Sequence, residues 1–155
     1  MMVATQTVWR ITTRRFADQA FSGEGARLYG GPWNKVGQSV IYTAASRSLA
    51  LLEMLVQDEP LRANYVLIPG YLPSSVGIEK LDSNNLPHGW RTHAGRQVLQ
   101  SIWMEWLRES RSCVLAVPSA VVPAELNFLI NPMHLDFQYI KLGEPETLDT
   151  DMRLY

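Results

Sequence analysis

The strand-forming and helix-forming segments of this sequence do not alternate regularly, and this order constrains the fold most strongly. In a βαβ protein each parallel strand is followed by a crossover helix. Here helical periodicity marks only residues 47–57 and 92–109, whereas β-branched and aromatic segments predict strands at residues 7–12, 40–44, 65–71, 76–81, 113–117 and 136–142. We therefore expect an α+β fold that is compact and mixed rather than a doubly wound sheet.

The chain is expected to form a single domain over residues 1–155. With 46% hydrophobic residues and no repeat, low-complexity tract or linker, it can bury roughly two-thirds of its unfolded surface. Its one cysteine, Cys113, cannot form an internal disulfide and lies in an apolar segment, which favours a core position over a nucleophile. The sequence also lacks a secretory signal and an apolar stretch of roughly 20 residues, so we expect a cytoplasmic protein without a membrane partner.

The charge distribution excludes one class of ligand and favours another. A net charge of −1 and a pI near 6.3 argue against a general nucleic-acid-binding protein, which needs a concentrated basic surface. Yet 11 of the 14 basic residues are arginines, and residues 1–47 carry six basic side chains against two acidic ones. From residue 136 onward acidic side chains outnumber basic ones by five to two. Because a guanidinium binds phosphate bidentately, this asymmetry points to a small phosphorylated ligand.

Common metal and nucleotide motifs are missing from the sequence. The three histidines, His88, His93 and His134, lack the spacing of metal ligands, so no metal is expected. The segment that starts at Gly23 begins like a dinucleotide fingerprint, but Leu28 stands where the third glycine belongs, and no P-loop occurs. A nucleotide would have to be bound by another arrangement.

One carboxylate, Glu53, interrupts an otherwise apolar run at residues 49–56. Helical spacing places it beside Leu49, Leu52 and Val56, on the face that we expect to pack against the core. A carboxylate in apolar surroundings is costly unless it is paired, so this position favours a functional role. The alternative is that Glu53 lies at the edge of the apolar face and pairs with a surface arginine.

Three further polar residues lie on predicted strands or at a strand end. Arg10 points away from its apolar neighbours in the first strand, which is ordinary on a solvent face and informative beside a ligand. Tyr42 fits strand packing or stacking on a planar heterocycle. Ser119 follows a buried strand, where it either satisfies a turn or presents its hydroxyl at the strand end. The residues by themselves leave both interpretations open at each position.

Together, six segments resemble the RES-domain family, which is named for an arginine, a glutamate and a serine and comprises toxins of bacterial type II toxin–antitoxin modules. In chain order they are WRI (9–11), SGEGARLYGGPWN (22–34), VIYTA (40–44), SLALLEMLV (48–56), VPSAVVP (117–123) and NFLINP (127–132). The resemblance implies a fold like that of ADP-ribosylating toxins, with a cleft for NAD. It also implies cleavage of the nicotinamide–ribose bond by hydrolysis or phosphorolysis, in some members with transfer of ADP-ribose to a protein.

Carried over residue by residue, the resemblance assigns catalytic roles to Glu53, Arg10 and Ser119. Glu53 would be the central carboxylate and Ser119 the family serine. Arg10 would contact the pyrophosphate or ribose side of NAD, and Tyr42 would stack near nicotinamide. The remaining members of the implied NAD-binding set are Arg27, Gly31, Pro32 and Asn127.

Pro32 is where this chain departs from the family, which has arginine in the loop motif GGRWN. Proline removes both a guanidinium and a backbone donor. Arg27, five residues earlier, would compensate if the loop folds back. The departure supports an alternative function, an attenuated or inactive RES-like module that acts mainly by binding an antitoxin.

The resemblance also implies partners. They are a cognate Xre-type antitoxin and, for a transferase, a target protein, and the five tryptophans and six methionines leave apolar surface for a partner or for a homodimer. A third function, a ribonuclease toxin, would need an acid–base cluster of His, Lys or Arg and a strongly basic surface that the sequence lacks. We therefore expect NAD as substrate, with no metal and no direct nucleic-acid contact.

Overall fold

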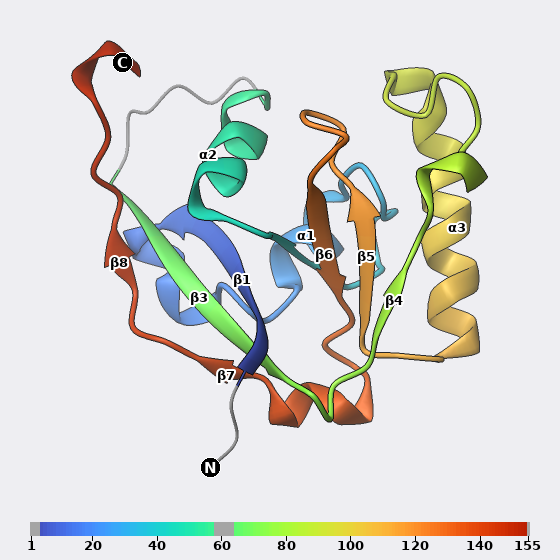
Figure 1. The fold of residues 1–155 in the computed structure, drawn as a ribbon, viewed down its shortest axis with the longest axis horizontal. Helices are drawn as coiled ribbons and strands as arrows, with labels where there is room; N and C mark the ends of the chain where they lie inside the picture. Colours follow the sequence, from blue (N-terminus) through green and yellow to red (C-terminus); the bar gives the residue numbers. More distant parts are fainter. Residues whose placement is uncertain (1–3, 58–63, 155) are drawn as a thin grey trace.

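The strands form one curled sheet of eight strands in the computed structural model, which describes residues 4–57 and 64–154 (Figure 1). The strand order is β4-β5-β6-β2-β1-β3-β7, and β8 pairs with β3. The pair β4–β5 is parallel and the other pairs are antiparallel. The strands are β1 (Ala4–Thr13), β2 (Ile41–Ala44), β3 (Tyr65–Pro73), β4 (Ile78–Lys80), β5 (Val114–Pro118), β6 (Leu126–Ile130), β7 (Lys141–Leu142) and β8 (Glu146–Thr147). The predicted α+β class is confirmed.

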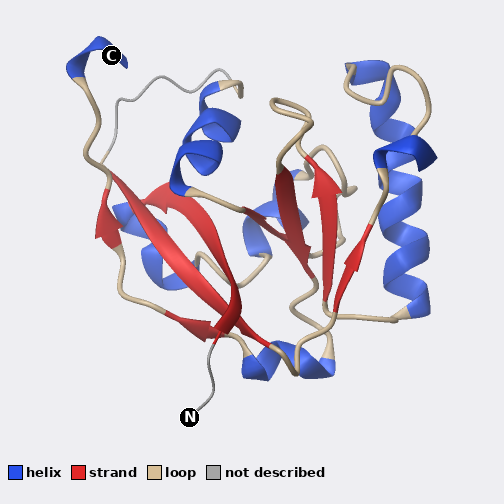
Figure 2. Ribbon diagram, viewed as in Figure 1, coloured by secondary structure: helices blue, strands red, loops and turns tan. Residues whose placement is uncertain are grey.

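Helices pack around this sheet and are drawn in blue in Figure 2. The α-helices are α1 (Glu24–Tyr29), α2 (Arg47–Leu55) and α3 (Arg96–Glu109), and the 3₁₀ helices are η1 (Arg14–Gln19), η2 (Ser83–Asn85), η3 (His93–Gly95), η4 (Leu135–Tyr139) and η5 (Met152–Leu154). Ser46 caps α2, because its side chain accepts a hydrogen bond from the Leu49 amide at 3.1 Å.

Helices α2 and α3 cover the same face of the sheet over its two halves. One row of directly paired residues crosses β1, β2, β6 and β5, and it consists of Trp9, Ala44, Asn127 and Val117. Residues that are paired in this way point to the same face of a sheet. Leu49 of α2 packs with Trp9 and Ala44, whereas the buried side chains of α3 pack in the cluster that contains Val117. The middle of this row, at Asn127, therefore lies between the areas that the two helices cover.

The opposite face carries the largest core cluster. Val8, Ile68 and Phe128 belong to it, and Phe21 and Ile140 join it from segments outside the sheet. Cys113 is fully buried in the same cluster, as predicted for a core cysteine. Burial raises the pKa of its thiol to about 12, and the neighbouring Asp136 charge adds to this rise.

Three local predictions were wrong. Residues 136–142 form η4 and the short β7 instead of one strand, because His134 caps a 3₁₀ turn through the Asp136 amide. Residues 24–29, where no helical periodicity was found, form α1, and residues 126–130, where no strand was predicted, form β6. On α2 the side chains of Leu52 and Val56 are 40% and 58% exposed, since the helix rests on the sheet mainly through Leu49 and Ala50.

Candidate active site

The end of β5 and the middle of α2 meet through two of the predicted catalytic side chains. The Ser119 hydroxyl donates a hydrogen bond of 2.6 Å to Oε1 of Glu53. In turn, Ser119 Oγ accepts hydrogen bonds from the amides of Val121 and Val122, each at 3.0 Å. Ser119 is fully buried and Glu53 half-buried. Because its proton points to Glu53 and its lone pairs to the two amides, the serine holds the carboxylate in a fixed position.

Within residues 4–57 and 64–154 Glu53 has no arginine partner, so none of the described arginines forms the surface ion pair that was the alternative. Its hydrogen bond to Ser119 uses Oε1. A carboxylate carries about four acceptor sites on its two oxygens. Glu53 therefore keeps acceptor capacity for a substrate hydroxyl or for a developing positive charge.

Tyr42 of β2 connects the sheet to the glycine-bearing loop, which we define as residues 30–40 between α1 and β2. Its ring lies on the face of the sheet that α3 covers. Its hydroxyl donates to Oδ1 of Asn34 at 2.7 Å and accepts from the Trp33 amide at 3.0 Å. Burial raises the pKa of the Tyr42 phenol, although Arg96 and Arg10 act in the opposite direction. The phenol therefore remains a hydrogen-bond donor at neutral pH.

Gly31 lies against this tyrosine. A Cβ atom added at Gly31 would lie 2.8 Å from the Tyr42 hydroxyl and 3.0 Å from Oδ1 of Asn34. Such distances are too short for real side-chain atoms, so the close approach of loop and strand requires glycine here. Pro32, the next residue, is half-buried and contributes no backbone donor.

Arg10 occupies the seam between the halves of the sheet. Strands β1 and β2 are joined through the single pair Trp9 and Ala44. Near that point Arg10 donates through Nε to the Ala20 carbonyl at 2.8 Å and through Nη1 to the Tyr42 carbonyl at 3.2 Å. Burial lowers the pKa of its guanidinium, while Tyr42 raises it. Strand alternation places Arg10 on the side of Val8, opposite the face that carries the Tyr42 ring and Glu53.

Of the two remaining predicted residues, Asn127 lies on the face that carries Glu53 and Ser119, and Arg27 lies elsewhere. Asn127 lies between Ala44 and Val117 on the face shared by α2 and α3, and its amide lies 3.4 Å from the Thr43 carbonyl. Arg27 is exposed on α1, where its Nε pairs with Glu24 at 2.6 Å. The structure thus brings Asn127 to the site and engages Arg27 elsewhere.

Asn34 is a residue of the site that sequence reasoning did not single out. It is fully buried, and its amide group donates to the carbonyls of Ala26, Lys35 and Gln38 at 2.8, 3.0 and 2.9 Å. With the Tyr42 contact, one side chain organises the whole loop. Its place in the GGPWN segment was the available signal, but no sequence rule reveals this set of hydrogen bonds.

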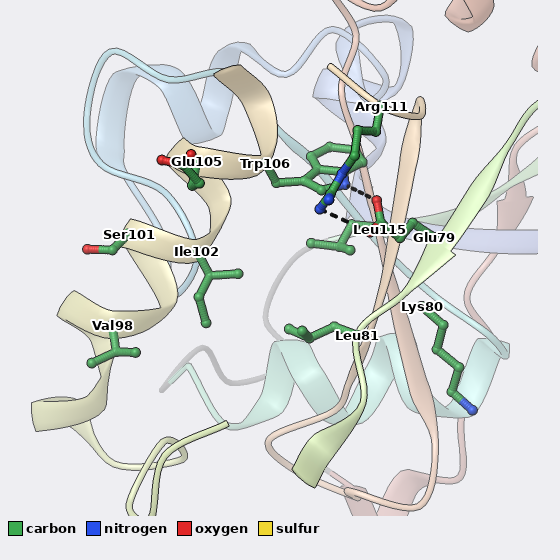
Figure 3. Close-up of a pocket in the computed structure, with 10 residues that line it drawn as sticks. All are labelled: Glu79, Lys80, Leu81, Val98, Ser101, Ile102, Glu105, Trp106, Arg111 and Leu115. Atoms are coloured by element: carbon green, nitrogen blue, oxygen red, sulfur yellow. Dashed lines mark hydrogen bonds and ion pairs between the residues drawn. The ribbon is translucent and has the colours of Figure 1, made fainter. Parts of the chain in front are cut away.

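A cavity of about 360 Å³ lies outside this site, between α3 and β4 (Figure 3). Glu79 of β4 accepts from the Trp106 indole at 2.9 Å and pairs with Arg111 at 3.0 Å at one end of it. Val98, Ser101, Ile102 and Glu105 line it from α3, and none of the predicted site residues does. The cavity therefore carries no part of the Glu53 site.

Within residues 4–57 and 64–154, no three His, Cys, Asp or Glu side chains gather as the ligands of a metal ion would. In the same ranges no helix combines the length and the apolar character that a bilayer crossing requires.

Known proteins are similar to this chain in sequence or in fold over most of their length. The profile of the "RES domain" matches residues 7–151. A protein named "Toxin Res" from Photorhabdus laumondii is 38% identical over 95% of this chain and 96% of its own length. The "Prs ADP-ribosylating toxin" of a Sphingobium species is 39% identical over 88% of this chain and 89% of its own. The crystal structure of the M. tuberculosis MbcT–MbcA toxin–antitoxin complex contains a similar fold, with a TM-score of 0.73 and 19% sequence identity. The match covers 95% of this chain and 86% of the chain in that structure.

Proposed function

The chain belongs to the RES-domain family, and on that premise we propose that it is the toxin of a toxin–antitoxin system and breaks the nicotinamide–ribose bond of NAD. The contact between Ser119 and Glu53 is the observation that carries this proposal. This hydrogen bond holds the Glu53 carboxylate in place on the face of the sheet between α2 and α3. The name of the Sphingobium relative, an ADP-ribosylating toxin, supports NAD as the substrate.

The reaction would use Glu53 as an electrostatic group. When the bond between ribose C1′ and the nicotinamide nitrogen breaks, its electron pair leaves with nicotinamide, which becomes neutral, and positive charge develops on the ribose. A fixed carboxylate stabilises that charge more in the transition state than in the ground state. Ser119 would position the carboxylate without touching the reacting atoms.

The sugar cation would then be captured at C1′ by an acceptor. Water would add its oxygen and release one proton, giving ADP-ribose; inorganic phosphate or a nucleophilic side chain of a target protein would give the phosphorylated or protein-linked product. The name of the Sphingobium relative favours the protein acceptor. Tyr42, which packs on the face that α3 covers, would stack near nicotinamide, and Asn127, paired with Ala44 in the neighbouring strand, would adjoin the same pocket.

Incubation of the purified chain with NAD tests this proposal, with released nicotinamide measured by chromatography. We expect release that depends on the wild-type carboxylate and is lost in Glu53→Gln. Glu125→Gln is the matched control, because Glu125 is exposed and touches Ser119 only through its backbone carbonyl. A preparation that melts cooperatively but releases no nicotinamide, with or without phosphate and cell extract, would refute the proposal.

Pro32 supports a second candidate function, binding of an antitoxin without enzymatic activity. The half-buried proline stands beside Gly31, where the family has arginine. We therefore propose an antitoxin as partner in either case, and the solved relative in a toxin–antitoxin complex fits this expectation. Co-purification with the antitoxin and no NAD loss would favour the second function. Unchanged NAD turnover in Pro32→Arg would remove the reason to call this chain attenuated.

A further inference from the structure

Two arginines outside the predicted set, Arg91 and Arg96, flank the candidate active site. Both are exposed, and within residues 4–57 and 64–154 neither forms an ion pair with a carboxylate. The other arginines at hand are already occupied, since Arg10 bonds two backbone carbonyls and Arg27 pairs with Glu24. Free guanidinium groups next to a substrate site are suited to phosphate.

Arg91 is anchored at the Ser119 end of the site. Its Nε donates to the Ala120 carbonyl at 2.8 Å, one residue beyond the serine that holds Glu53. That bond uses Nε and leaves the two terminal nitrogens without a partner among the described residues. A guanidinium presents its donors in a rigid fork, so fixing one nitrogen also fixes the direction of the others.

Arg96 lies at the Tyr42 end of the site. It is the first residue of α3, one turn before Gln100, so the two side chains lie on the same face of the helix. Gln100 Nε2 lies 3.4 Å from the carbonyls of both Gly31 and Asn34, which brings this face of α3 to the glycine-bearing loop. The effect of Arg96 on the pKa of Tyr42 agrees with this placement.

The segment between the two arginines is a tightly packed turn. The Gly95 backbone packs so closely that an added Cβ would lie 2.6 Å from the Gly89 carbonyl and 2.8 Å from Cα of Trp90. Thr92 ties the same turn together by donating to the Gly89 carbonyl from both its amide and its hydroxyl. The Trp90 side chain joins the core cluster under α3. The two guanidinium groups are therefore presented from a rigid turn.

We propose that Arg91 and Arg96 bind the pyrophosphate of the dinucleotide and position its reactive ribose between Tyr42 and Glu53. This inference rests on the proposed function for the identity of the substrate, whereas the chemistry it names, a diphosphate held by two guanidinium groups, can be measured separately. Neither arginine would touch the bond that breaks, so they are positioning residues.

Calorimetric binding of ADP-ribose to the intact chain tests the pyrophosphate contact, with adenosine as the probe that lacks phosphates. We expect Arg91→Ala and Arg96→Ala each to weaken ADP-ribose binding about tenfold or more, as the loss of one charge-assisted contact would. Adenosine binding should not change. The dependence of ADP-ribose affinity on salt concentration should also become shallower in each variant, which loss of a structural contact would not cause. Arg91→Gln is a second variant, since its amide can still donate to the Ala120 carbonyl.

Arg108→Ala is the matched control, because Arg108 lies on the same helix and pairs with Glu105. ADP-ribose affinity equal to the wild type in Arg91→Gln and Arg96→Ala, or no ADP-ribose binding by the wild-type chain, would overturn the inference. If the wild type releases nicotinamide and both variants keep its KM, the inference fails and the proposed function stands. If binding depends on the arginines but NAD is never cleaved, the proposed function fails alone.

Discussion

Ser119 and Glu53 lie 66 residues apart in the chain, yet a hydrogen bond of 2.6 Å joins the serine hydroxyl to the glutamate carboxylate. The serine follows β5 and the glutamate belongs to α2, so the bond connects one half of the sheet to the helix that covers the other half. Its formation depends on the correct assembly of both halves. The charge of Glu53 is therefore positioned only in the folded protein.

Replacing Glu53 by glutamine separates charge from geometry. The glutamine carbonyl can still accept from Ser119, so we expect the free energy of unfolding to change by less than about 1 kcal/mol. Nicotinamide release should fall by a factor on the order of 10² or more, because the negative charge that stabilises the ribose cation is gone. Thermal melting and chromatography check the two halves of this prediction.

Ser119→Ala is expected to behave differently. It leaves the half-buried amides of Val121 and Val122 without their acceptor, and we expect a loss of about 1–3 kcal/mol in the free energy of unfolding together with lower activity. Melting as high as the wild type with full nicotinamide release would show that the serine does not hold Glu53.

Arg10→Ala is expected to destabilise the fold. Two backbone carbonyls, at Ala20 and Tyr42, would lose a charged donor at the seam between β1 and β2, at a cost of roughly 3 kcal/mol or more in the free energy of unfolding. Urea unfolding measures this cost, and Arg10→Lys should recover only part of it, since a lysine cannot reproduce the two-nitrogen contact. Wild-type stability with loss of nicotinamide release would instead favour the direct NAD contact that the family resemblance implies.

Gly31→Ala should disturb the loop that carries Trp33 and Asn34, the hydrogen-bond partners of the Tyr42 hydroxyl. The added methyl group would meet the Tyr42 hydroxyl at 2.8 Å, and we expect a loss of about 1–3 kcal/mol in the free energy of unfolding, with reduced activity. Gly25→Ala is the control, because a Cβ at Gly25 in α1 meets nothing within 4 Å. That change should stabilise by roughly 0.5–1 kcal/mol. Equal melting temperatures for both variants would contradict the prediction.

The buried Cys113 thiol predicts a pH dependence at the alkaline side. Its pKa is raised from 9.0 to about 12 in the folded protein, so the unfolded state loses this proton first as pH rises. Stability from this group is therefore complete below pH 9 and declines between pH 9 and 12, by up to about 1.4 kcal/mol per pH unit. Urea unfolding from pH 8 to pH 10.5 should show a smaller decline in Cys113→Ala. An equal decline in both proteins would show that the thiol does not contribute.

The same burial predicts that Cys113 is inert in the native protein. A thiol-alkylating reagent at pH 8 should label it only after unfolding, because both access and the thiolate are lacking in the fold. Mass spectrometry before and after denaturation measures the labelled fraction.

Local chemistry in the sequence determined much of this protein. Short-range patterns predicted β1, β3, β5 and both long helices, since strand alternation and helical periodicity depend on neighbouring residues. The segments NFLINP and GGPWN supported the family resemblance. The sequence did not show that NFLINP would contribute the strand β6. Nor did it show that the GGPWN segment would be held by the hydrogen bond between Asn34 and Tyr42.

Tertiary structure decided which side chains meet. Ser119 reaches Glu53, Arg10 bridges the β1–β2 seam, and Gln100 brings Arg96 toward the glycine-bearing loop through contacts between residues far apart in the chain. The pattern of α2 put Leu52 and Val56 on the buried face, but the sheet covers only the strip around Leu49, so both are exposed. Periodicity fixes which residues of a helix share a face, whereas the surfaces of its neighbours fix how much of that face is covered.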